Sequence, residues 1–135
     1  PETEDFDLII FRDRQDYTHT TWAVSCGGFY ADRKHYALKE AIDRIVKNCS
    51  DNFYGENPLC PTGPVLFGSA IATFNLPVTS RYLIGQLDSV DGESVFKFMS
   101  TIFAFYKKNG LAAADPGLNG SNSYNELWHG GDVYE

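Results

Sequence analysis

The hydrophobic positions along the chain follow two different spacings. Phe6–Phe11 is a short, nearly continuous apolar run bounded by charged residues, which is typical of a buried strand. Thr20–Ser25 and Phe29–Ala31 are rich in residues that favour strands, and Gly27 and Gly28 separate these two runs. The first part of the chain is therefore predicted to supply short strands.

Two helices are predicted to follow. The first begins after Asp32, its predicted N-cap, and the second begins at Thr62–Pro64, where a threonine oxygen can cap the helix. Proline is tolerated in a first turn, because its missing N–H has no partner there. Apolar residues at helical spacing define both, namely Leu38, Ala41, Ile42, Ile45, Val46 and Cys49 in the first, and Leu66, Phe67, Ala70, Ile71 and Phe74 in the second.

Three further β-favouring runs are predicted to form a small antiparallel sheet. Arg81–Leu87 and Ser94–Met99 flank Asp91–Gly92, which is a strong signal for a tight hairpin, and Thr101–Tyr106 continues the pattern. Leu111–Ser123 is rich in Ala, Gly, Asn and Ser and is predicted as a loop. Residues 1–135 are thus expected to form a single α/β domain of mixed α+β type, with two main helices.

Composition narrows the functional classes. The net charge of −7 and the scattered basic residues argue against a nucleic-acid partner. Cys26, Cys49 and Cys60 are odd in number and contain no Cys-x-x-Cys pair, which favours reduced thiols in a cytoplasmic protein. No apolar stretch reaches membrane-spanning length, so no transmembrane segment is expected. The aromatic content of 15% favours a packed core or a surface that stacks on sugar rings.

The segment Asn57–Pro64 is the most informative stretch of the chain. Its three prolines and one glycine exclude regular structure, so it is predicted as a rigid loop that aims the positive end of the second helix at one place. Such an end suits an anion or a hydroxylated ligand. Thr62 either only caps the helix or, beside the open backbone of Gly63, contacts a ligand. Asn57 either binds a sugar hydroxyl or holds its own loop.

This segment also carries a resemblance to a family of glycosyltransferases. Pro61–Pro64 behind Tyr54–Pro58 resembles the "TGP" segment of family thirty-two of the carbohydrate-active enzymes, whose sugar-binding region carries a DXD motif. Trp22–Ala31 followed by His35 looks like that family's strand and "gHPfl" segment. Tyr36 stands where the family has a proline, so we assign no catalytic role to this segment.

The end of the chain extends the resemblance. Tyr124–Trp128 followed by Asp132–Tyr134 is similar to the "nYxxlW…vY" close of bacterial and viral members. The resemblance therefore covers nearly the whole chain and implies the second half of a GT-A-type nucleotide-diphospho-sugar transferase. In such an enzyme the DXD carboxylates hold a divalent metal, Mn²⁺ or Mg²⁺, which bridges the donor diphosphate.

The metal-binding half is expected to lie outside this chain. Asp5-Phe6-Asp7 spells D-x-D, but no apolar strand precedes it, so this chain alone is not expected to hold the metal. His129 is a further candidate metal ligand, because late-chain histidines hold the metal in some enzymes of this fold. Glu56 and Asp16 are candidate carboxylates for acceptor activation, but nothing in their spacing pairs them, so the catalytic residues are not assigned.

Two hypotheses of function follow. The first is the C-terminal portion of a glycosyltransferase of polysaccharide biosynthesis, which moves a sugar from a nucleotide-sugar donor to a glycan or lipid acceptor, in the cytoplasm or at the membrane surface. The second is a non-catalytic carbohydrate-binding or interaction module, whose exposed rings stack on glycans without turnover. For the first, the predicted substrate-binding residues are Asn57, Thr62, Gly63, Pro64, Tyr124 and Trp128.

Overall fold

One mixed sheet with the strand order β2-β1-β3-β4-β5 organises the fold. The computed structural model describes residues 5–73, 81–106, 124–131 and 133–134, so the predicted loop at 111–123 and Phe74 of the second predicted helix lie outside the description. The strands are β1 (Leu8–Arg12), β2 (Tyr30–Ala31), β3 (Tyr82–Val90), β4 (Glu93–Phe98) and β5 (Thr101–Tyr106). The helices are α1 (Gln15–Thr18), α2 (Tyr36–Ser50), α3 (Pro64–Thr73) and α4 (Tyr124–Gly130).

The prediction of a mixed α+β fold with two main helices is confirmed, and one detail of the sheet is corrected. β3, β4 and β5 pair antiparallel as predicted, but β3 also pairs parallel with β1, so they belong to the main sheet and not to a separate small one. The return from β1 to a parallel β3 passes through α2 and α3, as a parallel connection requires. Thr20–Ser25 is not a strand, and its only ladder contact is a bridge from Val24 to Arg12.

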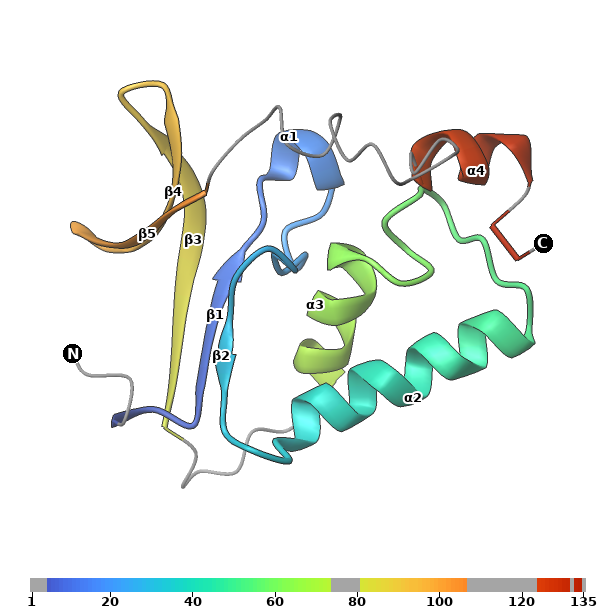
Figure 1. Cartoon of the computed structure of the whole chain (residues 1–135), viewed down its shortest axis with the longest axis horizontal. Helices are drawn as coiled ribbons and strands as arrows, with labels where there is room; N and C mark the ends of the chain where they lie inside the picture. Colours follow the sequence, from blue (N-terminus) through green and yellow to red (C-terminus); the bar gives the residue numbers. More distant parts are fainter. Residues whose placement is uncertain (1–4, 74–80, 107–123, 132, 135) are drawn as a thin grey trace, which may run out of the picture.

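β1 is buried on both faces, which explains its continuous apolar sequence. Leu8 and Ile10 pack with α2 and α3 on one face, whereas Ile9 and Phe11 pack with β3 and β4 on the other. Figure 1 shows α2 and α3 beside β1 and β2, whereas β4 and β5 curl away beyond β3. The core is therefore two apolar layers that share β1.

The β3–β4 turn is formed as the sequence predicts. Val90 pairs with Glu93 across a loop of two residues, Asp91 and Gly92. Their φ values of 53° and 83° are both positive, as a type I′ hairpin turn requires.

The two main helices begin at other caps than predicted. At α2 the ring Nδ1 of His35 accepts the backbone N–H of Ala37 at 3.2 Å, so His35 is the N-cap, while Asp32 forms the turn before it. At α3 the first helical bond joins the N–H of Phe67 to the carbonyl of Gly63 at 3.0 Å. Gly63 is thus in the cap position, and Thr62 lies one residue outside it.

None of the described helices has the length and apolar character that a membrane crossing requires.

Candidate functional site

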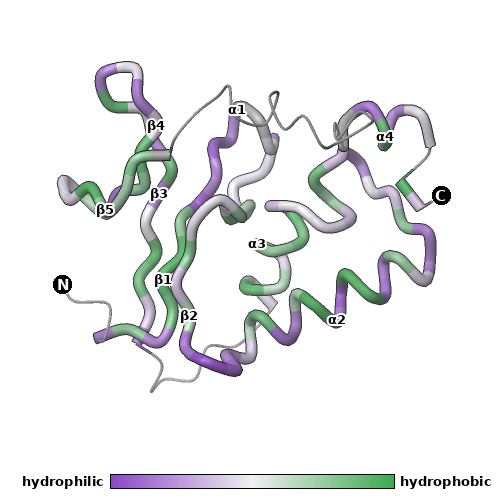
Figure 2. Tube along the Cα trace, in the orientation of Figure 1, coloured by the Kyte–Doolittle hydropathy of each residue, from purple (hydrophilic) through white to green (hydrophobic). Residues whose placement is uncertain are grey.

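A cavity of about 560 Å³ lies at the carboxyl end of β1. In sheets with parallel strands, this end of a strand is where ligands usually bind. Figure 2 shows the abrupt change there, from the hydrophobic β1 to a hydrophilic segment. Four parts of the chain line the cavity: the segment after β1 with Asp13, Arg14 and Thr18; the stretch Ser25–Gly27; the proline-rich loop with Pro58, Leu59, Thr62, Gly63 and Pro64; and Leu87 and Ser94 of the β3–β4 hairpin.

The proline-rich loop is held from both sides. Within the loop, the side-chain Oδ1 of Asn57 accepts the N–H of Leu59 at 2.9 Å, and its backbone carbonyl accepts the N–H of Cys60 at 3.0 Å. From α2, the side-chain Nδ2 of Asn48 donates to the carbonyl of Pro61 at 2.9 Å. Asn57 therefore has the loop-holding role, and it is not among the described residues that line the cavity.

Thr62, Gly63 and Pro64 lie at the cavity as predicted for a binding segment. The side chain of Thr62 is exposed, so it is available to a ligand. A Cβ on Gly63 would lie 3.0 Å from the carbonyl oxygen of Leu59, so only the smallest residue packs easily against this loop. The start of α3 therefore packs closely against the proline-rich loop where both line the cavity.

The opposite wall is fixed to both β1 and α3. The N–H of Ser25 donates to the carbonyl of Phe11 at 2.8 Å, and the N–H of Val24 donates to the carbonyl of Pro64 at 3.0 Å. Ser25 is 3% exposed, and its hydroxyl oxygen accepts the N–H of Gly27 at 3.2 Å. Ser25, Cys26 and Gly27 are thus positioned rigidly beside the start of α3.

Asp13 is the carboxylate of this cavity, and the sequence reasoning missed it. It follows β1 directly, its backbone N–H donates to the carbonyl of Ala23 at 2.8 Å, and its Oδ1 accepts the N–H of Arg14 at 2.7 Å. Burial raises the pKa of Asp13 above its usual 3.8, and the nearby charge of Asp16 acts in the same direction. Its position directly after a buried strand is the signal that could have identified it.

The two carboxylates named from the sequence lie elsewhere. Asp16 is exposed and forms an ion pair with the guanidinium of Arg14, and the hydrogen bond in that pair lowers the pKa of Asp16. Glu56 is exposed and is not among the described residues that line the cavity. Cys26 does line it, and burial together with the charge of Asp13 raises the pKa of its thiol, so it stays protonated near neutral pH.

Trp128 contacts Tyr54, in the segment that leads into the proline-rich loop. It is not among the described residues that line the cavity. Its indole Nε1 donates to the backbone carbonyl of Tyr54 at 2.8 Å, and the two ring centroids lie 6.5 Å apart. The hydroxyl of Tyr134 donates to the carbonyl of Phe53 beside it. Figure 1 shows α4 next to the segment that joins α2 to α3. Tyr124 begins α4, but its side chain lies outside the description.

His129 and Asp7, the residues considered as metal ligands, contact other side chains. The ring of His129 lies edge-on to Trp128 at 4.9 Å between centroids. Asp7 accepts hydrogen bonds from the backbone N–H of Arg81 at 2.9 Å and from its guanidinium at 3.1 Å. Among the described residues, no three His, Cys, Asp or Glu side chains are grouped as metal ligands. The described residues therefore offer no group of side chains that fits such a metal.

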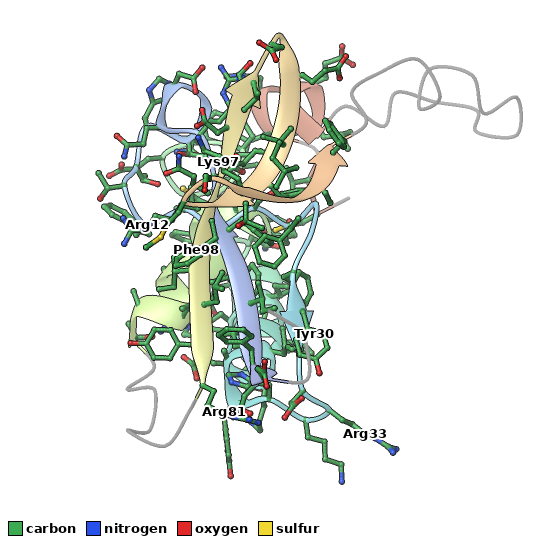
Figure 3. The ribbon with its side chains drawn as sticks, turned by 90° about the vertical axis from the view of Figure 1, so that its left-hand side faces the viewer. Arg12, Tyr30, Arg33, Arg81, Lys97 and Phe98 are labelled. Atoms are coloured by element: carbon green, nitrogen blue, oxygen red, sulfur yellow. The ribbon has the colours of Figure 1, made fainter. Side chains whose placement is uncertain are left out.

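A second, more polar cavity of about 420 Å³ lies nearby on the sheet. Arg12, Gln86, Lys97 and Phe98 are among its lining residues, and Figure 3 shows Arg12, Lys97 and Phe98 close together. Lys97 forms an ion pair with Asp88 at 2.5 Å, whose hydrogen bond lowers the pKa of that carboxyl group. Consecutive residues, Arg12 and Asp13, thus line two different cavities.

Comparisons with protein-family models, with curated proteins and with solved structures found no match.

Proposed function

We propose that this chain forms part of the substrate-binding region of a glycosyltransferase, and that the cavity at the start of α3 receives a sugar. One observation carries the proposal. The two segments that resemble family thirty-two in sequence, Trp22–Ala31 and Pro61–Pro64, meet at this cavity through Ser25–Gly27 and Thr62–Pro64. The shared location of these two segments supports the proposal.

The lining chemistry suits a sugar. Sugar hydroxyl groups both donate and accept hydrogen bonds, and the cavity offers a carboxylate at Asp13 and hydroxyl groups at Ser25 and Thr62. Pro58 and Leu87 add apolar surface for the C–H faces of a ring. A few placed polar groups on an apolar wall are characteristic of small-molecule sites.

A divalent metal is part of the implied reaction, but we assign no metal ligand in this chain. In a complete enzyme of this type, Mn²⁺ or Mg²⁺ would offset the charge of the donor diphosphate. Asp7 of the D-x-D sequence is instead bonded to Arg81, on the strand end opposite to the cavity, where β1 and β3 begin. We therefore derive no step through the metal.

The proposal is tested by titrating the chain, labelled for amide NMR, with UDP-sugars and GDP-sugars in the presence of Mn²⁺, and separately with neutral oligosaccharides. Shifts should concentrate at the amides of Cys26, Gly27, Thr62 and Gly63, and Thr62→Ala should weaken binding. Thr101→Ala, an exposed threonine on β5, is the matched control. Absence of shifts at these four amides with every ligand would reject the proposal.

The same titration separates the two classes of function. Binding that needs the nucleotide supports the glycosyltransferase. Glycan binding that shifts amides around exposed rings such as Trp22 and Phe105, and leaves the amides of the cavity unshifted, would favour the non-catalytic module.

A further inference from the structure

Asp13 is placed more firmly than an ordinary surface aspartate. The bond from its N–H to Ala23 and the bond from Arg14 to its Oδ1 fix both its backbone and its side chain. It is half-buried, lines the cavity, and is the first residue after strand β1. A ligand in the cavity therefore meets a carboxylate whose position is set in advance, which reduces the entropy cost of binding.

The carboxylate retains capacity for further hydrogen bonds. An ionised carboxylate offers about four acceptor positions, and the N–H of Arg14 occupies one of them. Asp13 is half-buried, so its charge is only partly solvated, and this burial raises the pKa of the carboxyl group. A hydroxyl donor from a ligand would replace the missing water, and such charge-assisted bonds are stronger than those between neutral groups.

The carboxylate of Asp13 itself disfavours an anionic ligand beside it. Asp16 adds a second negative charge nearby, whereas the guanidinium of Arg14, which pairs with Asp16, acts on Asp13 in the opposite direction. The remaining titratable lining residue, Cys26, has its thiol pKa raised and is neutral. A diphosphate placed here would face a carboxylate in a partly desolvated site, where like charges repel strongly.

We infer that the carboxylate of Asp13 accepts a hydrogen bond from a hydroxyl group of a neutral saccharide, and that this cavity takes the uncharged sugar and excludes the diphosphate of a nucleotide donor. This inference rests on the proposed function and narrows it to one substrate class and one binding residue. The buried hydroxyl of Ser25 also lines this cavity and offers a second polar contact.

The test uses the full chain with methyl glucoside, methyl galactoside and methyl mannoside as neutral probes, and inorganic pyrophosphate as the anionic probe. Amide shifts at Asp13 and Arg14 of the unaltered protein locate each probe without any substitution. Asp13→Asn keeps an acceptor oxygen for the N–H of Arg14 but removes the charge, and it should weaken binding of the preferred glycoside about tenfold. Arg12→Gln, one residue earlier and in the other cavity, should leave that binding unchanged.

The possible failures are distinguishable. Glycoside binding of equal strength in the unaltered protein and in Asp13→Asn overturns the inference and leaves the proposed function intact. So does pyrophosphate that displaces the glycoside and shifts the amides of Asp13 and Arg14. If neither the glycosides nor the nucleotide sugars bind, both the inference and the proposed function are wrong.

Discussion

The indole Nε1 of Trp128 donates a hydrogen bond to the backbone carbonyl of Tyr54, 2.8 Å away. This contact joins α4 to the segment that leads into the proline-rich loop, so Trp128 anchors that segment. Trp128→Phe keeps an aromatic ring but removes the donor, and it should lower the free energy of unfolding by about 1 kcal/mol.

Amide hydrogen exchange should also become faster at Gly55 and Glu56 in Trp128→Phe, because the loop loses one of its anchors. Trp22→Phe is the matched control, since Trp22 is 50% exposed and lies at the start of the opposite wall. A role for Trp128 in stacking on the ligand would instead give lost sugar binding with unchanged exchange.

Gly68 of α3 lies against the backbone of Trp22, and a Cβ built on it would be 1.9 Å from the Trp22 carbonyl oxygen. Gly68→Ala should therefore move α3 away from the wall at Val24–Gly27 and cost roughly 1–3 kcal/mol, despite the better helix propensity of alanine. Urea unfolding gives the free energy. Ala72→Gly, on the exposed side of α3, is the control for propensity alone and should cost no more than about 1 kcal/mol. A Gly68→Ala protein more stable than the parent would contradict the close packing.

The parts of the fold that local pattern determines were predictable. The apolar run of β1, the helical spacing of α2 and the Asp91–Gly92 hairpin each depend on residues that are neighbours in sequence. The parallel pairing of β1 with β3 was not, because it joins segments far apart along the chain. Thr20–Ser25 failed as a strand for the same reason: Val24 bonds to Pro64 of α3, and Ala23 bonds to Asp13.

The candidate site was also predicted only in part. Thr62–Pro64 was predicted at a binding site because prolines and a glycine before a helix limit what the loop can form. Asp13 was missed because it stands within the charged cluster Arg12–Asp16, which reads as solvated surface. Asp13 is partly buried and bonds to Ala23, which is distant in sequence, and no local pattern reports such contacts.

Arg44 of α2 bonds with residues of α3 and with its own helix. Its Nη1 donates to the hydroxyl of Ser69 at 2.6 Å, its Nη2 to the hydroxyl of Thr73, and its Nε to Glu40 at 2.8 Å. Lysine cannot reproduce this planar set of donors, so Arg44→Lys should destabilise the protein by about 1–2 kcal/mol in urea unfolding. Lys47→Ala removes an exposed pair on the same helix and should change stability by less than about 0.5 kcal/mol. If the two substitutions changed the free energy of unfolding equally, Arg44 would not link α2 to α3 in the way proposed.

Asp7 connects the start of β1 to the start of β3, and its charge state should control part of the acid stability. The hydrogen bonds from the backbone N–H and then the guanidinium of Arg81 hold the pKa of Asp7 below its usual 3.8. The folded state therefore favours the ionised form. The resulting stabilisation is complete above the pKa of 3.8 in the unfolded chain and is lost as the pH falls through the lower pKa of the folded state.

Asp7→Asn removes this titration, so the free energy of unfolding of the variant should decline less steeply than that of the parent as the pH falls below about 4. Some decline should remain, because Asp16 and Asp88 also have lowered pKa values. Urea unfolding across a series of pH values measures both slopes. If Asp7→Asn kept the full acid decline of the parent, the Asp7–Arg81 contact would not be what couples folding to protonation at the β1 end of the sheet.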